Sequence, residues 1–135
     1  ITFNQNVNTL LPPTLDKEIA IKSVENLNAS GDTSMYDAII KAINIESDPK
    51  PSQVVVLSDG AETTSVTRIE NLLKSEAAYS VKINAIGVQV TEEQKKILEN
   101  IAKEAGGSYL DVQDINSLIE TYKVILEKEL QVIQN

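Results

Sequence analysis

The residue best placed for chemistry follows a run of mostly β-branched residues, "QVVVLS", at positions 53–58. The run ends at Asp59, and a hydroxyl-rich segment, "AETTS", follows after Gly60. Ligands of open α/β sheets bind beyond the carboxyl ends of the parallel strands, so Asp59 stands where a functional carboxylate would stand. An ordinary Asp-Gly turn explains the same residues without any function, because aspartate hydrogen-bonds to nearby backbone in turns.

Composition limits what that chemistry could be. The chain has no histidine and no cysteine, which excludes thiol nucleophiles, disulfides, Cys/His zinc sites and histidine-based acid-base catalysis. The chain carries 12 basic and 20 acidic residues, a net charge of -8, so a nucleic-acid partner is not expected. No apolar run reaches membrane-spanning length. Carboxylates, hydroxyls, lysine and tyrosine remain as functional groups.

The elements that must position Asp59 alternate between strands and helices. A length of 135 residues predicts a single domain, residues 1–135. "ITF" and "VNTLLPP" predict a hairpin, and residues 53–58, 81–90 and 108–112 predict strands, the first of them central and parallel. Apolar spacing predicts helices around 20–27, 34–45, 69–77, 92–105 and 115–126. This alternation is typical of an α/β layer fold.

Local signals define several helix ends. Ser34 and Asp37 have the spacing of a capping box at the start of the second helix, and Thr91 and Gln94 have the same spacing before the fourth. Gly106 and Gly107 are expected to end that helix. Ser34 is therefore interpreted as a cap rather than a ligand.

Four segments occur in an order that is typical of one family: "SGDTSMYDAI", "VVVLSDG", "INAIGV" and "LENIAKEAGGSYL". Together they resemble the von Willebrand factor A (VWA) domain over nearly the whole chain. The resemblance implies a Rossmann-like, three-layer α/β fold. Its central sheet would be mostly parallel with one antiparallel edge strand, and helices would cover both faces.

The resemblance also implies a metal-ion-dependent adhesion site at the strand tips. By the family's pattern, Thr33 would offer a hydroxyl and Asp59 a carboxylate to Mg²⁺ or Mn²⁺, with Ser58 nearby. Magnesium takes about six oxygen ligands, and neutral hydroxyls leave it able to accept a carboxylate from a protein partner. The expected rim of the partner-binding surface comprises Asp32, Gly60, Glu62 and Thr63.

One family motif, Asp-x-Ser-x-Ser at the end of the first strand, is not in this sequence. We therefore expect a domain that is incomplete at its amino terminus and does not bind the metal alone. In the family this strand lies between the strands "ITF" and "VVVLS". Its absence would expose two sheet edges, to be filled by upstream sequence, by a swapped or strand-paired dimer, or by another partner.

Three functions fit these expectations. The first is a non-enzymatic protein-interaction or adhesion module with a partial metal site, and the second is a metal-independent structural or assembly scaffold of the same fold. The third is a receiver-like phosphoacceptor domain using Asp59, which would need a lysine near a later strand tip. The Asn-, Lys- and Ile-rich composition without cysteine suits a bacterial protein, and an extracellular or bacterial cell-surface location is favoured over a cytoplasmic one.

Overall fold

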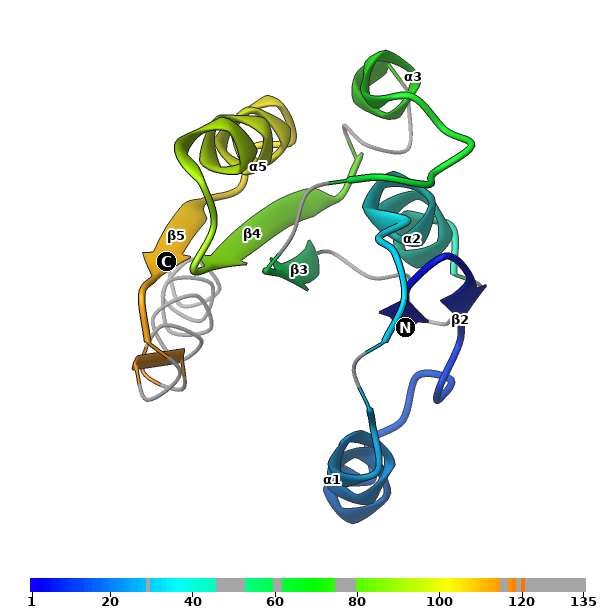
Figure 1. Cartoon of the computed structure of the whole chain (residues 1–135). Helices are drawn as coiled ribbons and strands as arrows, with labels where there is room; N and C mark the ends of the chain where they lie inside the picture. The colour runs from blue at the N-terminus through cyan, green and yellow to red at the C-terminus, as the bar shows by residue number, and fades with distance from the viewer. Residues whose placement is uncertain are drawn as a thin grey trace, which may run out of the picture.

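The computed structural model describes residues 1–28, 30–45, 53–59, 62–74, 80–114, 117–118 and 120 of the chain. The strands of these residues form two sheets (Figure 1). Strands β3 (Gln53–Ser58), β4 (Lys82–Val88) and β5 (Tyr109–Val112) make a parallel sheet in that order. Strands β1 (Thr2–Phe3) and β2 (Val7–Asn8) form a separate antiparallel pair. The predicted α/β class is confirmed.

Strand β4 is the central strand of the parallel sheet. Its register pairs Gln53 with Lys82 and Ser58 with Gly87, which brings the carboxyl ends of β3 and β4 to one edge. Residues 83–87 of β4 are all buried, as expected for a continuous apolar strand that is covered on both faces. The strand ends before Gln89, whose positive φ of 54° breaks the extended conformation.

Helices α2 (Met35–Ile43), α3 (Ile69–Lys74) and α5 (Glu92–Glu104) lie on one face of the parallel sheet (Figure 1). Their apolar stripes form one core with Val56, Ile83 and Ala85 of the sheet. On the opposite face, Ile86 and Val112 are buried and pack against neighbouring strand residues and Leu118. Most of the predicted closing helix, 115–126, lies outside the described residues. Residue 77 of the third predicted helix also lies outside them.

The predicted ends of α5 are confirmed. Thr91 and Gln94 make both hydrogen bonds of a capping box. After α5, Gly106 has a φ of 67°, and the backbone N–H of Gly107 donates to the carbonyl of Ala102. A Cβ at Gly107 would collide with the carbonyl of Ile83, so only glycine allows this close approach of helix end and strand.

Helix α1 (Lys17–Glu25) stands apart from the parallel sheet (Figure 1). Asp16 caps it by accepting hydrogen bonds from the backbone N–H groups of Glu18 and Ile19. None of its residues is buried, although the sequence spaces its apolar residues as an amphipathic helix. The hairpin is also shorter than predicted, because the extended segment stops at Asn8 rather than continuing to the prolines.

Candidate functional site

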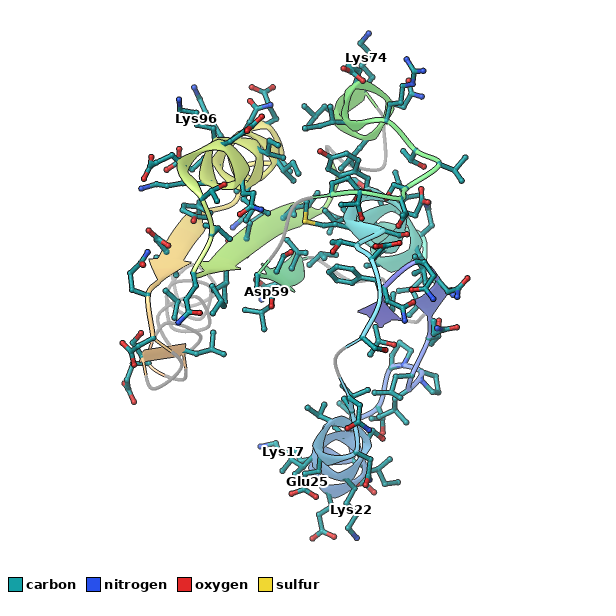
Figure 2. The ribbon with its side chains drawn as sticks, viewed as in Figure 1. Lys17, Lys22, Glu25, Asp59, Lys74 and Lys96 are labelled. Carbon is teal, nitrogen blue, oxygen red and sulfur yellow. The ribbon has the colours of Figure 1, made fainter. Side chains whose placement is uncertain are left out.

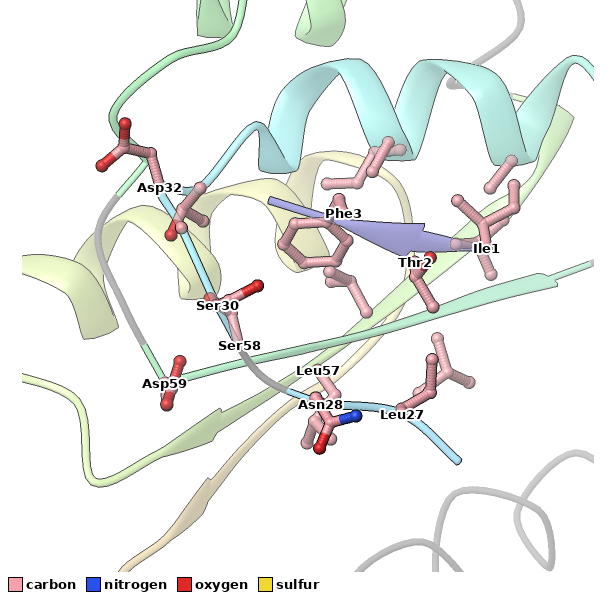
Figure 3. A pocket seen from close by; sticks show the side chains of 18 residues that line it. Ile1, Thr2, Phe3, Leu27, Asn28, Ser30, Asp32, Leu57, Ser58 and Asp59 are labelled. Carbon is pink, nitrogen blue, oxygen red and sulfur yellow. The ribbon is translucent and has the colours of Figure 1, made fainter. Parts of the chain in front are cut away.

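A groove of about 630 Å³ runs between β1 and β3 and ends at the carboxyl tip of β3. Its lining contains Thr33, Asp59, Ser58 and Asp32, four of the residues predicted for the site. Figure 3 shows Asp32 and Asp59 at the same end of the groove. The sequence-based prediction that Thr33 and Asp59 lie at one end of the sheet is consistent with this arrangement.

Asp59 and Ser58 owe their position to β3. The strand runs along the groove, and the Asp59 side chain lies at its tip, exposed to solvent (Figure 2 and Figure 3). Ser58 is 6% exposed and lies beneath it. The carboxylate therefore remains accessible to an ion or a partner, while the residue before it is fixed by the core.

The loop that carries Thr33 is held by backbone hydrogen bonds on both sides. The N–H of Ser34 donates to the carbonyl of Asn4 in the hairpin, at 2.8 Å. The N–H of Thr33 donates to the hydroxyl of Thr63 and its carbonyl accepts from the N–H of Thr63, both at 2.9 Å. These bonds fix the loop against the segment that follows β3.

Glu62, which the resemblance places on the rim of the partner-binding surface, makes hydrogen bonds within the protein. Its carboxylate accepts hydrogen bonds from the N–H of Tyr36 and the N–H of Ser65, at 2.9 and 2.7 Å. It also accepts from the Ser65 hydroxyl and the Thr64 N–H. These bonds join the start of α2 to the loop after β3, so the side chain has a structural task there. Gly60, also predicted for the rim, lies outside the described residues.

The capping box predicted for Ser34 and Asp37 is wrong. Ser34 is the N-cap of α2, but its side chain makes no capping bond and instead hydrogen-bonds to the Thr64 hydroxyl at 2.8 Å. The donors of the first turn are satisfied from across the fold, by Glu62 at Tyr36 and by the Ser65 hydroxyl at Asp37. A distant loop has replaced the local cap.

Asp37 stabilises the same loop in return. Its carboxylate accepts from the backbone N–H groups of Val66 and Thr67, at 2.8 and 2.9 Å. Partial burial raises the pKa of this carboxyl group, but hydrogen bonds from the Thr67 side chain and from the two N–H groups outweigh it and lower the pKa below its ordinary value. The segment 62–67 is thereby locked to α2.

A tyrosine lies in the same locked region. Burial raises the pKa of Tyr36, and the nearby carboxylates of Glu62 and Glu70 raise it further. The hydroxyl therefore stays protonated and neutral at physiological pH. Tyr36 packs in the core formed with the parallel sheet, consistent with a structural role.

At the polar end of the groove, the side-chain atoms that could bind a metal ion are oxygens. Hydroxyl and carboxylate oxygens are the ligands that Mg²⁺ and Mn²⁺ take in proteins. Among the described residues, no three His, Cys, Asp or Glu side chains gather as a metal-binding group. Thr33 and Asp59 fit part of a hard-cation shell, and the other ligands of that shell would come from water or from another segment. Ser30 also lines this end, a residue that sequence reasoning missed although it directly precedes Gly31 and Asp32.

The chain belongs to the von Willebrand factor type A domain family. The profile of that family matches residues 1–124, nearly the whole length. A search of curated proteins found no match. Membership of the family confirms the resemblance that the four sequence segments indicated.

Solved structures support the fold. The chain is similar to a conserved hypothetical protein, BatB, from Bacteroides thetaiotaomicron, with a TM-score of 0.72 and 19% identity over 96% of this chain and 77% of that one. An aerotolerance-related membrane protein from Bacteroides fragilis gives a TM-score of 0.68 and 20% identity over 93% and 76%. A von Willebrand factor type A structure from Catenulispora acidiphila gives 0.64 and 23%, and the match covers 78% of this chain but only 25% of that one.

Proposed function

We propose that this domain is a non-enzymatic protein-interaction module whose contact point is the polar end of the groove. Thr33 and Asp59 contribute oxygen ligands to a divalent cation, Mg²⁺ or Mn²⁺, which accepts a carboxylate from a protein partner. The observation that carries the proposal is that the two residues, 26 positions apart in the sequence, line the same groove. Membership of the VWA family, whose domains generally bind proteins, supports it.

The rigidity of the surrounding loops supports a binding role. Thr33 is fixed to Thr63, and the segment after β3 is fixed to α2 through Glu62 and Asp37. A preorganised oxygen cluster loses little conformational freedom when a cation or a partner binds. Asp32 and Thr63 are both exposed beside this cluster and form the rim that a partner would touch.

A metal-independent scaffold of the same fold is the second candidate. It is favoured by the absence of a three-residue acidic or imidazole group among the described residues. It is also favoured by Glu62, a predicted rim residue that is committed to internal hydrogen bonds. In that case the rim would bind a partner without a cation.

We do not propose a phosphoacceptor function. Such a domain would need a lysine beside Asp59. Lys95 of α5 lies 4.0 Å from Asp111 on β5, two strands away from β3, and the lysine of β4, Lys82, pairs with Gln53 at the start of β3. Asp59 follows the opposite end of that strand.

We propose an extracellular or bacterial cell-surface location. Relatives of known structure include the aerotolerance-related membrane protein from Bacteroides fragilis. None of the helices in the described part of the chain has the length and apolar character to cross a membrane.

Calorimetric titration with MgCl₂ and MnCl₂ tests the cation. The titration is made on this chain and on a version extended at its amino end, each compared with its Asp59→Ala variant. Binding by the extended version that is lost in Asp59→Ala would support the cation site. If neither version takes up a cation, the scaffold function replaces it.

A further inference from the structure

The peptide groups on both sides of Thr33 are bonded to the segment that follows β3. The N–H of Thr33 donates to the Thr63 hydroxyl at 2.9 Å. The carbonyl of Thr33 accepts from the N–H of Thr63 at 2.9 Å and from the N–H of Thr64 at 3.2 Å. One of these partners is a side chain, and the other two are backbone groups. A substitution at residue 63 can therefore remove the first bond and leave the other two in place.

The two sides of Thr33 are otherwise held unequally. On the carboxyl side, Ser34 is 2% exposed, and α2 begins directly after it. On the amino side, Asp32 and Gly31 are exposed, and Gly31 has a φ of 84°. The Thr63 hydroxyl therefore holds the peptide group that connects the exposed residue Asp32 to Thr33.

A fixed backbone restricts the direction of the Thr33 hydroxyl. Threonine is β-branched, so its side chain has few χ1 rotamers for a given backbone conformation. When the peptide groups before and after the residue are held, the hydroxyl oxygen can take only a few positions. Thr33 lines the groove together with Asp59. A ligand oxygen that is held before binding loses less conformational freedom when an ion binds.

Solvent exposure separates this positioning effect from the stability of the fold. The hydrogen bond between Thr33 and Thr63 is exposed, so water can accept the Thr33 N–H when the hydroxyl is removed. No buried donor is left without a partner, and the free energy of unfolding should change little. Water does not tie the peptide group to the segment after β3, however. Affinity for an ion should therefore fall while stability is retained.

We propose that Thr63 is a positioning residue of the cation site: its hydroxyl holds the peptide group before Thr33 and so directs the Thr33 hydroxyl to the ion. The inference rests on the proposed function, because it concerns the same site. Residues that orient the ligands of a metal commonly affect its affinity without touching it. This role is separate from the rim contact that Thr63 offers to a partner, and it operates when no partner is bound.

The test compares Thr63→Val with Thr63→Ser in the version extended at its amino end. Valine keeps the β-branched shape and removes the hydroxyl, whereas serine keeps the hydroxyl. In a calorimetric titration with MnCl₂, Thr63→Val should bind Mn²⁺ about tenfold more weakly than the wild type. Thr63→Ser should bind within about twofold of the wild type. In EDTA, the midpoint of thermal unfolding should stay within about 2 °C for both variants.

Thr14→Val is the matched control. The hydroxyl of Thr14 also accepts a backbone N–H at an exposed position, that of Asp16 at 3.0 Å, but Thr14 does not line the groove. This variant should bind Mn²⁺ within about twofold of the wild type.

The outcomes separate this inference from the proposed function. Wild-type affinity in Thr63→Val would overturn the inference alone, since the ion would bind without the Thr63 hydroxyl. Failure of Thr63→Ser to restore affinity would also overturn it, as would an equal loss in Thr14→Val or a lower unfolding midpoint in Thr63→Val. If the wild-type extended version takes up no Mn²⁺, the proposed cation site fails and this inference fails with it.

Discussion

The two ends of the described chain contain amphipathic helices with very different surroundings. In α5, Leu98 and Ile101 are 1% and 0% exposed, because β4 and β5 lie beneath them. In α1, Ile21 and Val24 are 58% and 61% exposed, and no residue is buried. Both helices begin with a well-formed cap. The difference therefore comes from tertiary packing, which supplies most of the stability of a short helix.

The sheet edges explain why packing differs. The α5 region has three paired strands to cover, including the fully buried Ile83 and Ala85 of β4. On the other side, β1 and β3 are separated by the groove, and the hairpin strands are two residues long. Burial is complete where a strand is paired on both sides and incomplete where an edge is open. We therefore predict that substitutions on the open side change the free energy of unfolding little, and that substitutions on the paired side lower it.

The largest expected effect comes from substituting matched apolar residues in these two helices. Ile101→Ala should lower the free energy of unfolding by about 3 kcal/mol, because it leaves a cavity in a fully buried position. Val24→Ala should change it by less than about 0.5 kcal/mol, since the side chain already faces solvent. Urea denaturation followed by circular dichroism measures both. Similar losses for the two variants would show that α1 is packed in solution and would remove the contrast.

A smaller effect is expected at Glu62, which links the start of α2 to the loop after β3. Glu62→Ala should cost about 1–2 kcal/mol, because it leaves the N–H groups of Tyr36 and Ser65 without their acceptor. Glu99→Ala on the exposed side of α5 is the control and should be nearly neutral. A neutral result at Glu62 with loss of partner binding would instead identify Glu62 as a rim residue.

The smallest effect is a pH dependence at Asp37. Hydrogen bonds lower the pKa of this group in the folded protein below its ordinary value of 3.8, so its charged form stabilises the fold. That stabilisation is present above pH 3.8 and is lost as the pH falls through the lowered pKa. Between about pH 4 and about pH 2, the unfolding free energy of the wild type should fall more steeply than that of Asp37→Asn. Parallel curves would show that Asp37 does not contribute.

The sequence predicts the elements whose signals are local. The β-branched run gives β3, and the threonine and glutamine spacing at 91 and 94 gives the start of α5. The cap of α2 could not be found in the same way, because its acceptor, Glu62, is 26 residues away from Tyr36. The exposure of α1 also escapes sequence analysis, since a periodic pattern shows which face is apolar and does not show what covers it.

The candidate site was predicted to a similar extent. Position after a strand identified Asp59, and resemblance to the VWA family identified Thr33; both line the same groove. The hydrogen bonds that hold Thr33 to Thr63 join residues 30 positions apart, so no local pattern reveals them. The apolar part of the groove cannot be predicted from a local pattern either, because its walls come from two separate sheets.

The most direct test of the central claim is a titration of the ¹⁵N-labelled chain with Mn²⁺, observed as paramagnetic broadening of its amide signals. This method detects weak binding, so it suits a site that has only part of its ligands in this chain. We predict that the amide signals of Asp32, Thr33 and Asp59 broaden at lower Mn²⁺ concentrations than the other amide signals. In Asp59→Ala this difference should disappear. Broadening that is spread evenly over the acidic surface, and unchanged in Asp59→Ala, would contradict it.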